Sequence, residues 1–191
     1  MGHSIAAETK TIVFFGDSLT AGYGLDSPDL AYPALIQAKI DAAGLPWHCV
    51  NAGLSGETTA GGVRRLDWIL RQPVDIFVLE LGGNDGLRGI PVENSRANLQ
   101  TMIERIRNRY PHVTVVLAGM KLPTNLGADY TRQFAAMYPE LARTNHLALI
   151  PFLLDGVGGI TNLNQADGIH PTAEGHQIVA ETVWRVLQPL L

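Results

Sequence analysis

The sequence predicts an α/β fold, a three-layer α/β/α sandwich built around a five-stranded parallel sheet. Short apolar runs rich in β-branched and aromatic residues alternate along the chain with longer segments of helical periodicity. The short runs are apolar at successive positions, which is typical of strands that are buried on both faces of a parallel sheet. No internal repeat or linker divides the 191 residues, so we expect one domain.

Five segments have the features expected of strands, because they are brief, apolar and bounded by Gly, Pro or Asn. In chain order they are Thr11–Phe15, Trp47–Asn51, Val74–Leu81, His112–Gly119 and Leu147–Ile150.

Five longer segments are predicted to be helices. They are Leu30–Ala43, Ala60–Arg71, Pro91–Arg109, Asp129–Asn145 and Pro171–Leu187. In the last segment, apolar residues recur at helical spacing and predict one buried stripe. Pro171 suits the first helical position, where its missing N–H would have no partner in any case.

We expect residues 11–191 to form the single domain and residues 1–10 to be an N-terminal tail. Met1-Gly2-His3-Ser4 has the character of residues left by cloning. Ile5-Ala6-Ala7 resembles the end of a removed small-x-small cleavage site.

Composition excludes several classes of protein and of site. The net charge is −4 and the basic residues are dispersed, which argues against a nucleic-acid-binding surface. Cys49 is the only cysteine, so neither an intramolecular disulfide nor a thiolate zinc site can form. No apolar run approaches the roughly 20 residues that span a bilayer. We therefore expect a soluble protein without a nucleic-acid partner or an integral membrane segment. We also expect a monomer with a small-molecule ester as its substrate.

Polar residues follow the predicted strands where each strand ends. Gly16-Asp17-Ser18 comes after the first, Asn51–Thr59 after the second, Gly82–Gly86 after the third, and Asp167–His170 after the fifth. Open α/β sheets bind ligands in the crevice outside the carboxyl ends of their strands. These four segments are therefore expected to meet at one edge of the sheet.

The chemistry of these residues fits acyl transfer. A serine hydroxyl becomes a nucleophile when a base takes its proton and a third group holds that base in one tautomer. Ser18, His170 and Asp167 can supply these three roles. Of the six histidines, only His170 has an acid three residues before it. The structural alternative is that Ser18 only caps the helix that follows it.

A carbonyl addition also needs hydrogen-bond donors for the developing oxyanion, each typically worth ~10²–10³ in kcat. The Ser18 N–H, the Gly56 N–H and the Asn84 side-chain amide are the expected donors. Asp17 is expected to be structural, and Asp85 to hold the loop that presents Asn84.

These segments together resemble the SGNH, or GDSL, hydrolase family. Gly16-Asp17-Ser18-Leu19 matches its first block, Gly56 the glycine of its second, Gly83-Asn84-Asp85 its third and Asp167-x-x-His170 its fifth. The resemblance covers essentially the whole chain and supports Gly56 over Gly53 as the donor. Ala52–Thr58 and Leu81–Gly89 are similar to the bacterial branch that contains thioesterase I / protease I / lysophospholipase L1 and the arylesterases.

The resemblance implies the family's flavodoxin-like fold and a serine esterase without metal or organic cofactor. It implies activity on short- to medium-chain acyl and aryl esters, extending to acyl-thioesters and lysophospholipids. Many relatives are exported, so a periplasmic or secreted protein is expected, and otherwise a cytoplasmic one.

Two loops of mixed character are expected to bind the substrate, since apolar walls with an open end suit an acyl chain. They follow the Asn84 turn and the fourth strand. Gly86 and Gly89 would allow the first loop to hinge. The residues expected to line the groove are Leu87, Arg88, Gly89, Ile90, Leu122, Pro123 and Ile169.

Three alternatives remain at this point. A carbohydrate O-deacetylase of the same family would use the same residues. A metal-dependent phosphoesterase would need several His and Asp ligands, but the Asp-x-His pair that usually opens such a pattern is absent. A nucleotide- or flavin-binding module would need a Gly-x-Gly-x-x-Gly or P-loop turn after a strand, and neither occurs.

Overall fold

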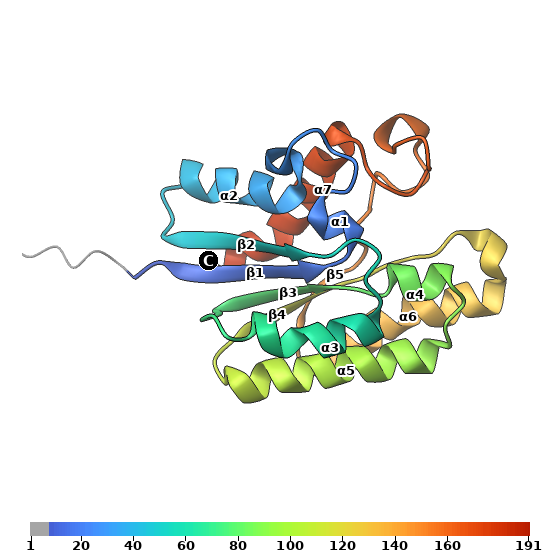
Figure 1. Ribbon diagram of the computed structural model, residues 1–191, viewed down its shortest axis with the longest axis horizontal. Helices are drawn as coiled ribbons and strands as arrows, with labels where there is room; N and C mark the ends of the chain where they lie inside the picture. Colours follow the sequence, from blue (N-terminus) through green and yellow to red (C-terminus); the bar gives the residue numbers. More distant parts are fainter. Residues whose placement is uncertain (1–7) are drawn as a thin grey trace, which may run out of the picture.

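A computed structural model describes residues 8–191 of the protein. The proposed cloning residues and the cleavage-site residues before Glu8 lie outside the described residues. Five parallel strands form one sheet in the order β2-β1-β3-β4-β5, with helices on both faces (Figure 1). The predicted three-layer α/β/α sandwich is confirmed.

The strands occupy all five of the segments predicted for them. Their bounds are β1 (Lys10–Gly16), β2 (Trp47–Gly53), β3 (Ile76–Glu80), β4 (Thr114–Ala118) and β5 (Ala148–Ile150). β3 is buried along its whole length, as expected for a central strand. β2 is only half-buried after Trp47 because it is an edge strand of the sheet.

Residues 8–191 contain seven α-helices, two of them single turns at the edge that carries the candidate site. They are α1 (Ser18–Ala21), α2 (Tyr32–Ala42), α3 (Thr59–Ile69), α4 (Gly83–Leu87), α5 (Val92–Arg109), α6 (Ala128–Thr144) and α7 (Ala173–Leu187). Short 3₁₀ turns are η1 (Pro28–Leu30), η2 (Thr124–Leu126), η3 (Thr161–Leu163) and η4 (Gln188–Leu190). α1, α2 and α7 cover one face of the sheet, and α3, α4, α5 and α6 lie on the other (Figure 1).

The expected position of Pro171 is wrong. α7 begins at Ala173, and the Thr172 side chain caps it by accepting the Gly175 N–H at 3.2 Å. A threonine oxygen satisfies a free N–H of the first turn, which a proline cannot do. Pro171 instead pairs with Asn164 in an isolated antiparallel bridge.

The strand order places the candidate residues side by side. β1 lies between β2 and β3, so the chain leaves β1 toward one edge and reaches β3, β4 and β5 on the other side. Ligand sites of open α/β sheets lie at such a reversal of strand order. The turn after β1 carries Ser18 and the turn after β3 carries Asn84, so both stand at this point. Within residues 8–191, no helix has the length and apolar character needed to cross a membrane.

Candidate active site

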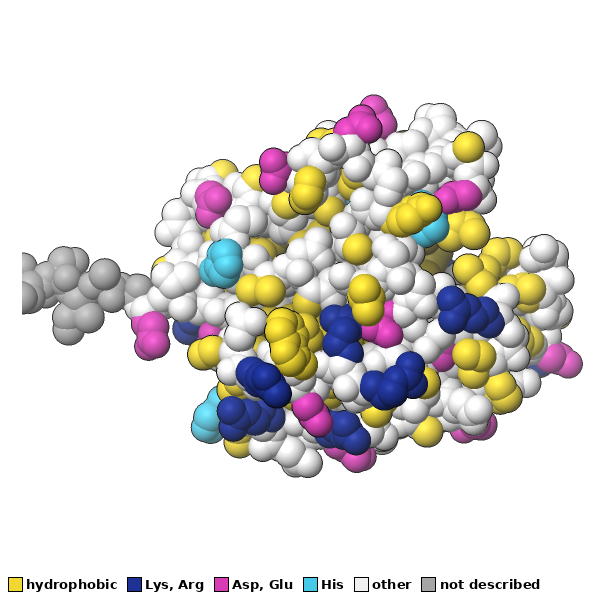
Figure 2. All heavy atoms as spheres, viewed as in Figure 1, with side chains coloured by type: hydrophobic (Ala, Val, Ile, Leu, Met, Phe, Trp, Pro, Cys, Tyr) yellow, Lys and Arg dark blue, Asp and Glu magenta, His cyan; other side chains and the backbone are white. Residues whose placement is uncertain are grey.

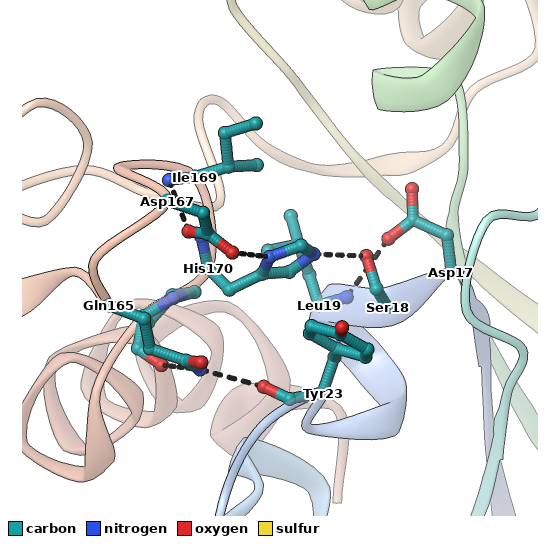
Figure 3. A network of polar contacts seen from close by, with 9 residues as sticks. Asp17, Ser18, Leu19, Tyr23, Gln165, Asp167, Ile169 and His170 are labelled. Carbon is teal, nitrogen blue, oxygen red and sulfur yellow. Dashed lines mark hydrogen bonds and ion pairs between the residues drawn. The ribbon is translucent and has the colours of Figure 1, made fainter.

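Ser18 is the first residue of α1, and its side chain does not cap the helix. The N-cap is Asp17, whose Oδ1 accepts the Leu19 N–H at 3.0 Å. α1 ends after one turn because Gly22 adopts a left-handed conformation with φ 76° and returns its N–H to the Ser18 carbonyl. The reading of Ser18 as a helix cap is therefore wrong, and its hydroxyl faces His170 (Figure 3).

Ser18, His170 and Asp167 form a continuous chain of hydrogen bonds (Figure 3). His170 Nε2 lies 2.8 Å from Ser18 Oγ, and His170 Nδ1 lies 2.6 Å from Asp167 Oδ2. Ser18 comes from the turn after β1, and the other two residues come from the loop before α7. The spacing Asp-x-x-His thus brings the carboxylate to the imidazole as the sequence predicted.

Asp167 is held as a carboxylate by its own loop. Its Oδ1 accepts the N–H groups of Ile169 at 2.9 Å and His170 at 3.0 Å. Hydrogen bonding, above all from the His170 N–H, lowers the pKa of Asp167 to about 2. An ionised Asp167 favours the imidazole tautomer with its proton on Nδ1, which leaves Nε2 to accept the Ser18 proton.

Two residues that sequence reasoning missed help to place His170. The ring of Tyr23 lies against the imidazole, with 4.6 Å between the ring centroids. Gln165 Nε2 donates to the Tyr23 carbonyl at 2.7 Å and to the Pro171 carbonyl at 3.0 Å. These bonds join the loop before α7 to the end of α1 (Figure 3). No local motif marks either residue, because the contact joins segments 142 positions apart.

The Asn84 side chain stands on α4 and points toward the Ser18 turn. Its Nδ2 donates to Asp17 Oδ2 at 3.0 Å. An amide nitrogen carries two hydrogens, so this bond fixes the group while one hydrogen remains for a substrate oxygen. Asp17 therefore links the turn after β1 to the turn after β3, which agrees with its expected structural role.

Asp85 secures α4 from the opposite side. This carboxylate is fully buried and accepts the Thr59 N–H at 2.8 Å, the Thr59 hydroxyl at 2.5 Å and the Ser95 hydroxyl at 3.1 Å. It thereby ties α4 to the starts of α3 and α5. Asn84 is thus presented by a turn that is anchored to two helices.

The backbone donors expected at Ser18 and Gly56 are free to bind an oxyanion. Among the hydrogen bonds of residues 8–191, neither N–H group donates to a protein acceptor. Gly56 has φ 78°, a conformation that favours glycine, whereas an added Cβ would meet only Arg88 Nη2 at 3.9 Å. Backbone conformation, more than contact with neighbouring residues, is thus what requires glycine here. Arg88 also donates to the Gly56 carbonyl at 3.2 Å.

The loops expected to bind substrate differ in how firmly they are held. Gly86 lies within α4, and an added Cβ there would overlap the side chain of Leu122, so the two loops are packed together. Gly89 has φ 66° and open space around it. The Ile90 carbonyl accepts the Tyr130 hydroxyl at 2.6 Å. A hinge is therefore more easily accommodated at Gly89 than at Gly86. In the second loop, Pro123 is exposed.

Exposed hydrophobic side chains gather at the same edge of the sheet. Among residues 8–191, all the large exposed hydrophobic side chains except Trp68 lie in segments that follow strand ends. Of these exposed side chains, only Leu87 and Ile169 were among the residues predicted to line the groove. Figure 2 shows hydrophobic side chains around a hollow on the right, at the carboxyl ends of the strands. We call this set the apolar rim: Tyr23, Leu54, Leu87, Leu126, Ile160 and Ile169.

His176 has a packing role and lies apart from the hydrogen-bonded chain of Ser18, His170 and Asp167. It is buried on α7, and its Nδ1 accepts the Tyr32 N–H at 3.2 Å. Burial lowers the pKa of His176 to about 4, so it is neutral near pH 7. In the described part of the chain, no three His, Cys, Asp or Glu side chains are grouped to hold a metal ion.

Comparison with known proteins places this geometry in a family. Residues 14–178 match the sequence profile of the GDSL-like lipase/acylhydrolase family. The chain is 40% identical to the esterase TesA of Pseudomonas aeruginosa over 97% of its own length and 91% of that protein. It is 36% identical to thioesterase 1/protease 1/lysophospholipase L1 of Escherichia coli K12, over 97% of its own length and 87% of that protein.

A solved structure shows the same fold. The psychrotrophic esterase EstA from Pseudoalteromonas, inhibited by monoethylphosphonate, superimposes with a TM-score of 0.88 at 30% sequence identity. The superposition covers 95% of this chain and 98% of EstA.

Proposed function

The chain belongs to the GDSL-like lipase/acylhydrolase family, and from this premise we propose that it hydrolyses carboxylic esters through an acyl-enzyme formed on Ser18. Its relatives include an esterase and a thioesterase/lysophospholipase, so the chain is a carboxylic ester hydrolase. The observation that carries the residue assignment is the chain of hydrogen bonds from Ser18 Oγ through His170 to Asp167 Oδ2.

Acylation begins when His170 Nε2 removes the Ser18 proton as Oγ attacks the ester carbonyl. The carbonyl oxygen becomes an oxyanion, for which the free N–H groups of Ser18 and Gly56 and the second hydrogen of Asn84 Nδ2 are donors. Asp167 stabilises the imidazolium that forms. The intermediate then collapses, His170 protonates the leaving alcohol or thiol, and the acyl group stays on Ser18.

Deacylation repeats the sequence with water as the nucleophile. His170 takes a proton from water as its oxygen attacks the acyl carbonyl, and the same donors bind the second oxyanion. Collapse breaks the bond to Ser18 Oγ, which recovers its proton from His170. The products are a carboxylic acid and the regenerated enzyme, so the cycle balances without a further reactant.

The apolar rim supports acyl and aryl esters as the substrate class. Its exposed hydrophobic side chains come from segments that follow each of the five strands, and the turn after β1 also carries Ser18. Removing apolar surface from water contributes roughly 25 cal/mol per Å², so an acyl chain or aromatic ring gains affinity on such a surface. We propose short- to medium-chain acyl and aryl esters as substrates, with acyl-thioesters and lysophospholipids as further ones.

Replacement of the nucleophile tests the assignment. Ser18→Ala is expected to abolish turnover of p-nitrophenyl esters while the protein stays folded, as judged by thermal unfolding. Ser55→Ala, in the loop after β2, is the matched control and should keep full activity. Retention of wild-type rates by Ser18→Ala, or an organophosphonate adduct on Ser55, would contradict the proposal.

The substrate panel separates the remaining alternatives. We expect kcat/KM to be higher for p-nitrophenyl acyl esters and acyl-CoA than for acetylated sugars; the reverse order would favour a carbohydrate O-deacetylase. Activity in excess chelator should equal activity without it. Loss that added metal restores would instead favour a metal-dependent phosphoesterase.

We also propose that the protein acts as a monomer without nucleic acid and is periplasmic or secreted. Kinship with exported members of the family supports the compartment, and the dispersed basic residues support the absence of a nucleic-acid partner. Light scattering after size-exclusion chromatography tests the first point, and cell fractionation tests the compartment.

A further inference from the structure

Glu80, the last residue of β3, is a buried acid directly behind the Ser18 turn. Its side chain has no exposed surface. Its Oε2 accepts the Asp17 N–H at 3.2 Å and the Thr20 hydroxyl at 2.8 Å. Both donors belong to the turn that carries Ser18, one from the residue before it and one from α1.

The space for this carboxyl group exists because position 16 is glycine. A Cβ at Gly16 would overlap Glu80 Oε2 and Thr20 Oγ1. The Thr20 hydroxyl lies 2.8 Å from the Tyr32 hydroxyl, which extends the network into α2. The glycine before Asp17 thus admits a polar cluster beneath the nucleophile.

We propose that Glu80 is a positioning residue for the reaction, which fixes the Ser18 turn and, through Asp17, the Asn84 amide. This inference rests on the proposed function of Ser18. The path is continuous: Glu80 holds the backbone of Asp17, Asp17 Oδ2 holds Asn84 Nδ2, and Asn84 is a donor to the oxyanion.

The surroundings of Glu80 favour its neutral form. Asp17 and Glu80 are both buried, and among residues 8–191 neither forms an ion pair with a basic side chain. Burial and the Asp17 charge raise the pKa of Glu80 well above its usual range. Two adjacent buried carboxyl groups share one proton more easily than they carry two charges.

The hydrogen-bond pattern assigns that proton to one atom. Oε2 accepts two hydrogen bonds and so acts as the carbonyl oxygen, while Oε1 has no partner within the described residues. A buried O–H without a partner costs less than a buried unpaired charge. Asp17 then keeps the negative charge, since it accepts hydrogen bonds from Leu19 and Asn84.

The other groups that face this pair are few. Tyr32 from α2 and Tyr138 from α6 are fully buried, and burial raises the pKa of each well above its usual range, so both face the pair as neutral hydroxyls. Asp85 of α4 raises the pKa of Asp17, whereas His170 lowers it. Arg65 of α3 donates to the Ala52 carbonyl at 2.9 Å and to the Gly16 carbonyl at 3.4 Å, and its Nε pairs with Glu57. Within the described residues it forms no hydrogen bond or ion pair with Asp17 or Glu80.

Two substitutions separate positioning from simple stability. Glu80→Gln imitates the neutral acid, since its carbonyl oxygen can accept both hydrogen bonds. Glu80→Leu fills similar space but accepts neither. kcat is measured per active site, titrated by the burst of an organophosphonate that releases p-nitrophenol. We expect a loss of about 10²-fold for Glu80→Leu, as for a small misplacement of reacting groups, and only a few-fold loss for Glu80→Gln.

A second pair of variants applies where Glu80→Leu does not fold. Thr20→Val removes one donor to Oε2 with little change in volume, and Thr182→Val on α7 is the matched buried control. We expect a lower kcat per titrated site in Thr20→Val than in Thr182→Val.

The protonation state of Glu80 has its own test. The wild type should show an infrared band of a protonated carboxylic acid at neutral pH, and this band should disappear in Glu80→Gln.

The outcomes separate this inference from the proposed function. Equal kcat per titrated site in wild type and in Glu80→Leu, or in the two threonine variants, overturns the positioning role. An equal loss in Glu80→Gln and Glu80→Leu overturns the neutral carboxyl group. Failure of the organophosphonate to label Ser18 in the wild type overturns the proposed function instead.

Discussion

Asp167→Asn tests the tautomer argument because each oxygen of this carboxylate has a defined partner. Oδ1 accepts two backbone N–H groups, from Ile169 and His170, and Oδ2 accepts the imidazole Nδ1. An asparagine has one oxygen for these three donors. If it keeps the backbone bonds, its NH₂ faces Nδ1 and donates to it.

The expected magnitude follows from that reversal. With Nδ1 as an acceptor, the imidazole proton moves to Nε2, 2.8 Å from Ser18 Oγ, where a base is required. A change of this kind in a serine triad costs about 10⁴ in kcat, roughly 5.4 kcal/mol at 1.36 kcal/mol per tenfold. The Asp167 side chain is 39% exposed, so water can partly replace it, and we expect a loss of about 10³–10⁴.

The assay is p-nitrophenyl ester turnover together with the rate of organophosphonate labelling at Ser18. Both should fall in parallel, because both need His170 Nε2 as a base. Asp155→Asn, in an exposed turn after β5, is the control and should keep full activity. A loss below about tenfold in Asp167→Asn would refute the reasoning, since the tautomer would then not depend on this carboxylate.

Two further predictions concern the oxyanion donor and the buried histidine. Asn84→Ala should lower kcat by about 10²–10³ with a much smaller effect on KM, measured with p-nitrophenyl esters, because its amide acts mainly in the transition state. His176→Asn keeps an acceptor for the Tyr32 N–H and removes a titrating group. The pKa of His176 falls from 6.5 unfolded to about 4 folded, so its contribution to stability is present above pH 6.5 and is lost as pH falls toward 4. Urea unfolding at pH 7 and pH 5 should show that the free energy of unfolding falls less between these two pH values in His176→Asn than in the wild type. The raised pKa of Asp17 makes the folded state more stable as pH falls, but this effect is the same in both proteins.

Much of the fold follows from local pattern. The five strands occupy the predicted segments because their apolar runs and bounding residues are local signals. Helix ends were less accurate, as Pro171 illustrates, because competition between neighbouring residues for the cap decides where α7 begins. The single turns α1 and α4 are too short to produce a periodic pattern.

The candidate site could be predicted where its residues stand at strand ends. This placement predicted that Ser18, Asp167 and His170 lie together and that Asn84 faces the Ser18 turn, as the structure shows, while their catalytic roles stay a proposal. Tyr23, Gln165 and Glu80 were not predicted, because their contacts with the site depend on how distant segments pack. Glu80 in particular lies at the end of a strand that is buried along its whole length, so the sequence does not distinguish it from the core. Its hydrogen bonds to Asp17 and Thr20 become visible only in the folded structure.

Asp17, next to Ser18, and Asp167, bonded to His170, have different surroundings. Asp17 is buried, and its oxygens are occupied by Leu19 and Asn84, so it is not available to His170. Burial raises the pKa of Asp17, whereas backbone donors lower that of Asp167. In the proposed mechanism the acid beside the imidazole stays charged throughout the reaction, which the lowered pKa of Asp167 favours. This difference favours Asp167, from the loop before α7, as the acid of the proposed triad, although Asp17 directly precedes Ser18.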